Sequence, residues 1–111
     1  MRTVLVVDDQ DSVRDVIRIA LEQAGYRVLE ARTPSTAIGL VETDSDVDLL
    51  LADVVLPEMD AFELASRIAI AVPGVAVLYT SGYTDAREEG NFIRKPFSPA
   101  EIVAKVESIL A

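Results

Sequence analysis

The chain has 111 residues, half of them hydrophobic, and its 19 acidic and 10 basic residues give a formal net charge of −9. This charge opposes direct nucleic-acid binding, which relies on lysine and arginine, and no stretch approaches the roughly 20 apolar residues of a membrane span. Because cysteine and histidine are absent, disulfides and thiolate metal sites are excluded, and any phosphohistidine must belong to a partner. We expect a single cytoplasmic domain with no membrane or nucleic-acid partner.

The first half of the chain predicts two strands, each followed by a helix. An apolar run at 4–7 indicates the first strand. Apolar residues at helical spacing follow as far as Ala24, and Gly25 supplies the usual helix stop. A second strand is expected at 26–31. Thr33-Pro34 then predicts the cap and first turn of the second helix.

The next segment repeats this alternation. A third strand is expected at 48–52, and a loop at 56–60 leads to a helix that carries apolar residues over 64–72. Pro73-Gly74 ends that helix. A fourth strand follows at 75–78.

The end of the chain departs from the regular pattern. Residues 82–90 leave room for only one or two helical turns before a fifth strand at 92–94, so we expect a shortened fourth helix. The motif that begins at Ser98 and ends at Glu101 is a capping box and starts the last helix. Five strands alternating with helices predict a doubly wound α/β fold with a parallel sheet.

Four of the predicted strands end at residues suited to phosphate chemistry, namely Asp8 and Asp9, Asp53, Thr80 and Ser81, and Lys95. In open α/β sheets, ligands bind at the carboxyl ends of the strands. Carboxylates that meet there repel one another by about 4 kcal/mol per pair at 4 Å and an effective dielectric constant near 20. A hard divalent cation such as Mg²⁺ relieves this repulsion.

Other readings of individual acids are open at this point. Asp8 or Asp9 alone would also be suitable as the cap of the first helix. Glu58 and Asp60 are interpreted as solvated loop charges rather than ligands.

The motifs at these strand ends resemble those of the receiver domain of two-component response regulators. They are Val7-Asp8-Asp9, the segment 53–60, Thr80-Ser81-Gly82-Tyr83 and Lys95-Pro96-Phe97. The resemblance covers essentially the whole chain and implies one receiver domain over 1–111, from a single-domain regulator or a hybrid histidine kinase. It also implies a flavodoxin-like (βα)5 sheet in the order 2-1-3-4-5, with a cis bond before Pro96.

The resemblance implies a function as a phosphoacceptor in a two-component phosphorelay. Asp53 would take a phosphoryl group from a histidine kinase or a histidine phosphotransfer protein. Asp9 and Asp53 would bind Mg²⁺ directly, Asp8 through a water, and Val55 through its backbone carbonyl, with Mn²⁺ as a possible substitute. No turnover of an external substrate is expected.

Further residues are assigned to phosphate binding and signalling by the same resemblance. Lys95 would pair with the phosphoryl group and Ser81 would donate a hydrogen bond to it. Ser81, Phe92 and Tyr83 would form a switch that reports phosphorylation to a downstream protein target. Ala61 stands where the family usually has glycine, which predicts a different loop path or backbone strain there.

Two other functions remain as alternatives. A pseudo-receiver would bind a partner without taking phosphate, but such a module has no need to hold repelling carboxylates together. A phosphatase of the haloacid dehalogenase type also uses an aspartate nucleophile, but it needs a second acid two residues later. That position is Val55 here.

Overall fold

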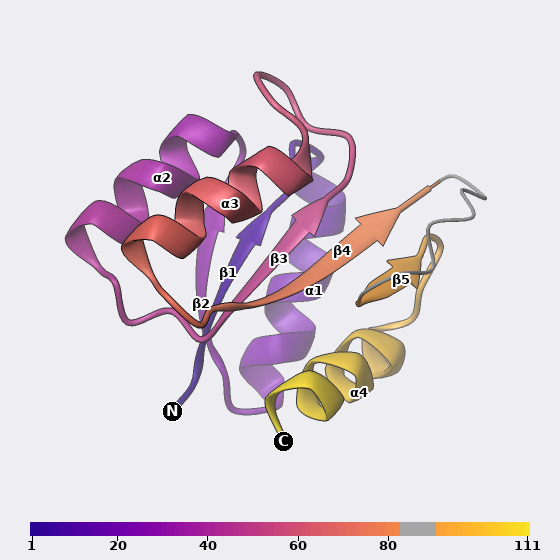
Figure 1. Ribbon diagram of the computed structural model, residues 1–111. Coiled ribbons are helices and arrows are strands. Elements are labelled where there is room, and N and C mark those ends of the chain that lie inside the picture. The colour runs from indigo at the N-terminus through magenta and orange to yellow at the C-terminus, as the bar shows by residue number, and fades with distance from the viewer. Residues whose placement is uncertain (83–90) are drawn as a thin grey trace.

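Five parallel strands form one sheet in the order β2-β1-β3-β4-β5 (Figure 1). The computed structural model describes residues 1–82 and 91–111, and its strands are β1 (Thr3–Val7), β2 (Arg27–Ala31), β3 (Leu49–Asp53), β4 (Ala76–Ser81) and β5 (Phe92–Arg94). The predicted flavodoxin-like fold and strand order are confirmed. Neighbouring strands pair in parallel, so their carboxyl ends lie along one edge of the sheet.

Helices cover both faces of this sheet (Figure 1). They are α1 (Asp11–Gln23), α2 (Pro34–Thr43), α3 (Ala61–Ala71) and α4 (Pro99–Leu110). The α2 and α3 helices pack on one face, and α1 and α4 pack on the other. The shortened helix expected between β4 and β5 falls on 83–90, which lie outside the described residues. Within the described part of the chain, no helix has the length and apolar character needed to cross a membrane.

Local sequence signals explain where the helices begin and end. Thr33 accepts a hydrogen bond from the third residue of α2, and Ser98 and Glu101 form the predicted capping box of α4. Gly25 has a φ of 95° immediately after α1, a left-handed conformation that glycine adopts without steric cost. The sequence therefore places these helix ends within a residue or two of their observed positions.

The two central strands explain the apolar runs of the sequence. Every residue of β1 and β3 is buried, because helices cover the sheet on both sides. Leu5 and Leu50 pack toward α2 and α3, whereas Val4 and Leu49 pack toward α1 and α4. Each such side chain contributes about 1.5–3 kcal/mol to stability. This packing fixes the positions at which β1 and β3 end.

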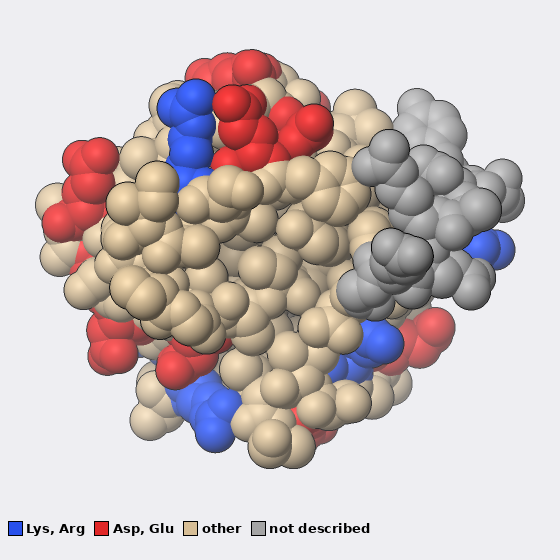
Figure 2. All heavy atoms as spheres, viewed as in Figure 1, with Lys and Arg blue, Asp and Glu red and all other residues tan. Residues whose placement is uncertain are grey.

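The surface in Figure 2 agrees with the charge of the sequence. Acidic side chains lie around the rim of this face, and the visible lysine and arginine side chains are scattered. The centre of the face is uncharged. Among the described residues visible on this side, lysine and arginine therefore form no broad patch.

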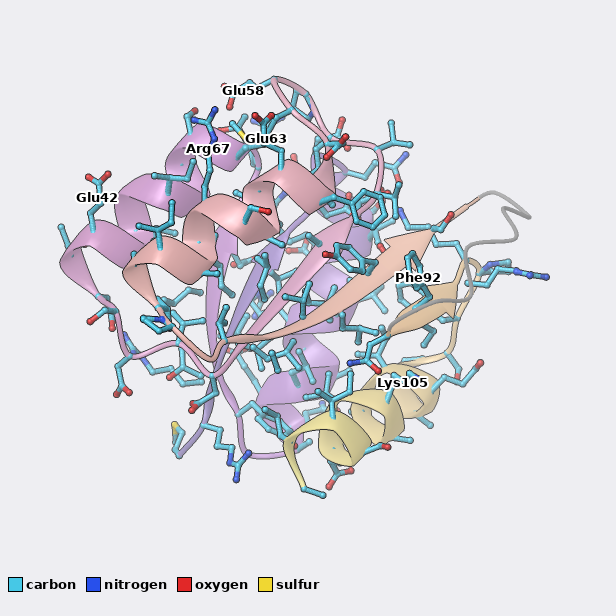
Figure 3. All side chains as sticks on the ribbon, in the orientation of Figure 1. Glu42, Glu58, Glu63, Arg67, Phe92 and Lys105 are labelled. Carbon is cyan, nitrogen blue, oxygen red and sulfur yellow. The ribbon has the colours of Figure 1, made fainter. Side chains whose placement is uncertain are left out.

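The loop at 54–60 corrects the expected backbone strain at Ala61 and adds contacts to two acids expected to be solvated. The left-handed backbone falls on Glu58, with a φ of 70°, while Ala61 is an ordinary, fully buried first residue of α3. Glu58 (Figure 3) is exposed, as expected for a loop charge, and its carboxylate also accepts hydrogen bonds of 2.9 Å from both the backbone N–H and the hydroxyl of Ser35. Asp60 is the N-cap of α3. Both acids therefore have structural roles.

We expect Glu58→Ala to destabilise the fold by about 1 kcal/mol, because it loses the bonds to Ser35 and keeps the left-handed backbone. Glu58→Gly should be close to neutral, since glycine relieves strain of about 1 kcal/mol at this φ. Urea denaturation of the two variants measures the difference. Equal stabilities would show that the backbone of Glu58 is not strained.

Candidate functional site

Three aspartates meet at the carboxyl edge of the sheet. Asp8 and Asp9 follow β1, and Asp53 ends the neighbouring strand β3. One carboxylate oxygen from each lies within 4.8 Å of the others. Asp8 is 0% exposed and Asp53 is 7% exposed, whereas Asp9 faces solvent. The topology therefore produces the acid cluster that the strand ends predicted.

The alternative in which Asp8 or Asp9 caps the first helix is wrong. The N-cap of α1 is Gln10, and it makes no side-chain capping bond. Asp8 Oδ1 instead accepts a 2.8 Å hydrogen bond from the backbone N–H of Gln10, within the turn that leads to the helix. The two acids are thus held at the sheet edge rather than used to start α1.

Lys95 follows β5, the outermost strand of the sheet, and its side chain extends to the acid cluster. Its Nζ lies 2.8 Å from Asp53 Oδ2 and 3.3 Å from Asp8 Oδ2. Its backbone N–H donates to the carbonyl of Ser81 at 2.8 Å, which continues the β4–β5 pairing. The bond between Lys95 and Pro96 is cis, as predicted. Lys95 and two of the acids therefore form one ion-paired group.

Burial and charge act in opposite directions on these groups. Burial by itself lowers the pKa of Lys95, but the hydrogen bond and charges from Asp53 and Asp8 outweigh burial and raise that pKa above its usual value. Burial raises the pKa of Asp8, partly offset by the Gln10 hydrogen bond and by Lys95. Lys95 therefore stays protonated, and its charge does not fully offset the burial of Asp8.

The donor set fits a hard divalent cation. Its ligand atoms are carboxylate oxygens, which Mg²⁺ prefers, and Asp9 leaves one side open to solvent for the waters that Mg²⁺ retains. The three acids carry more negative charge than Lys95 neutralises. A bound cation would relieve this excess.

Asp8→Asn should stabilise the Mg²⁺-free fold against urea. The variant removes a buried negative charge that repels Asp53, and its side-chain carbonyl can keep the hydrogen bond from Gln10. Urea denaturation in EDTA measures this gain, with Asp46→Asn at an exposed position as the matched control. A loss of stability in Asp8→Asn would contradict net repulsion at the site.

Two further predicted residues lie next to Asp53. The backbone N–H of Val55 donates a 3.1 Å hydrogen bond to Asp53 Oδ1, so the turn after β3 orients the carboxylate. Ser81 ends β4, the strand that pairs with β3, and is partly exposed. Both residues therefore lie at the edge of the sheet that carries the acids.

Phe92 belongs to a group of three aromatic side chains (Figure 3). Its ring centroid lies 5.1 Å from that of Tyr79 and 6.3 Å from that of Phe62, and the Tyr79 and Phe62 rings are 4.7 Å apart. Sequence reasoning missed Tyr79 and Phe62. Strand alternation could have found Tyr79, because it shares a face of β4 with Ser81. Tyr83, the third predicted switch residue, lies outside the described residues.

A mostly apolar groove lies beside Lys95. Its volume is about 450 Å³, and it is lined by Ser12, Val13, Val16, Gly82, Lys95, Pro96 and Phe97. It runs between α1 and the segment that joins β5 to α4. The groove therefore places apolar side chains of α1 next to Lys95.

Known proteins share this architecture. The chain is 36% identical over 120 residues to the phosphate regulon transcriptional regulatory protein PhoB of Pseudomonas aeruginosa, covering 98% of the chain and 52% of PhoB. It is 30% identical to the response regulator receiver protein CpdR of Brucella abortus, covering 99% of the chain and 98% of CpdR. The chain thus spans about half of PhoB and nearly all of CpdR. A crystal structure of the receiver domain from the hybrid histidine kinase CckA superposes with a TM-score of 0.88 at 30% identity, covering 98% of the chain and 99% of that domain.

An open 2-1-3-4-5 sheet with acids and a lysine at its carboxyl edge places the chain in the class of CheY-like α/β modules. Residues 4–107 match the response regulator receiver domain. The chain belongs to that family and is a receiver domain of two-component response regulators. Members of the family are signalling modules that interact with histidine kinases and downstream effectors, and they bind Mg²⁺ at an acidic pocket.

Proposed function

We propose that the chain, as one receiver domain over 1–111, accepts a phosphoryl group on Asp53 from the phosphohistidine of a partner. The observation that carries this proposal is the setting of the Asp53 carboxylate. One oxygen is oriented by the N–H of Val55 and the other is paired with Lys95 at 2.8 Å. Phosphoryl transfer depends mainly on positioning and charge neutralisation, and both are present here.

The transfer exchanges one bond to phosphorus for another. A carboxylate oxygen of Asp53 forms a bond to phosphorus as the bond from phosphorus to the histidine nitrogen breaks, and the nitrogen keeps the electron pair. The Lys95 ammonium turns from Asp53 Oδ2 to the phosphoryl oxygens, and the Ser81 hydroxyl donates a hydrogen bond to one of them. The product is an aspartyl phosphate on this chain, and the partner's histidine nitrogen takes up a proton from water to become a neutral imidazole.

The acid cluster supplies the cation site of this reaction. Asp9 and Asp53 would bind Mg²⁺ directly, Asp8 would act through a water, and Val55 would contribute its backbone carbonyl; Mn²⁺ has the same preference for oxygen ligands. When bound, Mg²⁺ neutralises negative charge shared by the carboxylates and the phosphoryl oxygens. The crowding of Asp8, Asp9 and Asp53 within 4.8 Å supports this assignment.

The groove beside Lys95 supports delivery by a protein partner. On its α1 side, Val16 is 43% exposed, and Ile19, one turn further along, is 46% exposed. A histidine kinase or histidine phosphotransfer protein that covers this apolar surface would bring its phosphohistidine to the adjacent acids. We assign the downstream signal to Ser81, Phe92 and Tyr83, which would act on a protein target.

The two alternative functions are less well supported by the site. A pseudo-receiver would gain nothing from burying Asp8 and Asp53 beside each other, because their repulsion only destabilises the fold. An aspartate phosphatase needs a second acid where the chain has Val55, and 55% of Val55 is exposed. We therefore propose no turnover of an external substrate.

Intact-mass spectrometry after incubation with Mg²⁺ and acetyl phosphate tests the proposed function. We expect the wild-type chain to gain one phosphoryl group. A chain that stays unmodified under conditions that label another receiver domain would favour the pseudo-receiver.

A further inference from the structure

Thr80 carries a buried polar group that the proposed mechanism does not use. The residue is 0% exposed, and its hydroxyl oxygen has no hydrogen-bond partner among the described residues. A valine would occupy nearly the same volume without a polar atom. An unpaired buried hydroxyl destabilises a fold. We therefore expect another state of the site in which the Thr80 hydroxyl forms a hydrogen bond.

The sheet register places Thr80 beside the phosphoacceptor. Thr80 pairs with Asp53 across β4 and β3, just as Leu78 pairs with Leu51 two residues earlier. Leu78 and Leu51 both pack toward α1 and α4. Because side chains alternate along a strand, Thr80 and Asp53 lie on this same face, on strands about 4.8 Å apart.

The strand order also places Thr80 on the path of Lys95. Ile93 pairs with Thr80 on β5 and packs toward α1 and α4, so Lys95, two residues later, is on the same face. The ammonium of Lys95 nevertheless bonds to Asp53, on the far side of β4. Its side chain must therefore cross β4 close to Thr80.

We propose that Thr80 is a positioning residue for Lys95, an inference that rests on the proposed function. In the structure described here, Lys95 donates to Asp53 and Asp8. Lys95 would have to release Asp53 Oδ2 when a cation or a phosphoryl group is bound at Asp53. The Thr80 hydroxyl, turned by a rotation about its Cα–Cβ bond, then accepts a hydrogen bond from the ammonium and keeps it directed at the phosphoryl oxygens.

Thr80→Val tests this role, with Thr80→Ser as the matched variant that keeps the hydroxyl. We expect acetyl phosphate to label Thr80→Val about tenfold more slowly than wild type in the presence of Mg²⁺, as for the loss of one hydrogen bond to a charged group. Thr80→Ser should recover most of that rate. In EDTA, Thr80→Val should melt at the wild-type temperature or above it, because the hydroxyl is unpaired in that state.

One labelling result and one melting result would each overturn the proposal. One is wild-type labelling of Thr80→Val. The other is a melting temperature in EDTA that falls in Thr80→Val and recovers in Thr80→Ser, because the hydroxyl would then already be paired in the free fold.

Mg²⁺ titration separates failure of this proposal from failure of the proposed function. Even if the wild type takes no phosphate, we expect Thr80→Val to bind Mg²⁺ several-fold more weakly, since Lys95 must still leave Asp53. In a Lys95→Met background, Thr80→Val should have no further effect on Mg²⁺ affinity. Equal affinity of wild type and Thr80→Val, or an undiminished effect in the Lys95→Met background, would show that Thr80 does not act through Lys95.

Discussion

Asp53→Asn should leave the chain completely unlabelled under conditions in which the wild type gains one phosphoryl group. The amide has nearly the same shape as the carboxylate, and its oxygen can keep the hydrogen bond from Val55. It is not a nucleophile toward phosphorus, so the chemical step is lost while the fold is retained. Intact-mass spectrometry measures the label, and fragmentation locates it.

The matched control for this variant is Asp48→Asn. Asp48 precedes β3 and accepts a hydrogen bond from the N–H of Thr3, so it lies at the opposite edge of the sheet from Asp53. This variant should be labelled like the wild type. Label on Thr80 or Ser81, or any label that persists in Asp53→Asn, would contradict Asp53 as the phosphoacceptor.

Removal of the divalent cation is expected to have the second largest effect. Millimolar Mg²⁺ should stabilise the wild-type fold, by about 2.7 kcal/mol at a concentration 100 times the Kd. The stabilisation arises because the fold assembles Asp8, Asp9 and Asp53, whereas the unfolded chain does not. Excess EDTA should reverse it and should also reduce labelling by acetyl phosphate. Thermal melts with and without Mg²⁺ measure the effect.

Asp9→Ala should lose most of the Mg²⁺ stabilisation while keeping the buried Asp8 and Asp53. Its control is Asp46→Ala, which removes an exposed acid that precedes β3. A wild-type melt that does not respond to Mg²⁺, or an equal response in Asp9→Ala and the wild type, would count against a cation site.

The fold was predictable because its signals are local or periodic. The apolar runs that became β1 and β3 needed only burial on both faces, and the capping box at Ser98 needed only neighbouring residues. Predicted and observed strand bounds differ by at most three residues, and those of β5 agree. The third and fourth strands extend further than predicted, because the polar residues Asp53 and Ser81 continue the backbone pairing beyond the apolar runs.

The residues of the candidate site were predictable from the sequence, but many of the hydrogen bonds around it were not. Asp8 and Asp53 meet because adjacent parallel strands end at one edge. The bonds between Glu58 and Ser35 join residues far apart in the sequence and depend on how a loop meets a helix. A family pattern predicts a different loop path or backbone strain at Ala61, yet the left-handed residue is Glu58, three residues before α3 begins.

The sharing of Lys95 by Asp8 and Asp53 has a consequence for the order of events at the site. With all three acids ionised, one ammonium leaves two negative charges uncompensated. An anionic phosphoryl donor is repelled by that charge, whereas a divalent cation cancels it. Under the proposed function, the cation therefore binds before the phosphoryl donor. A phosphorylated partner without the cation then produces no signal.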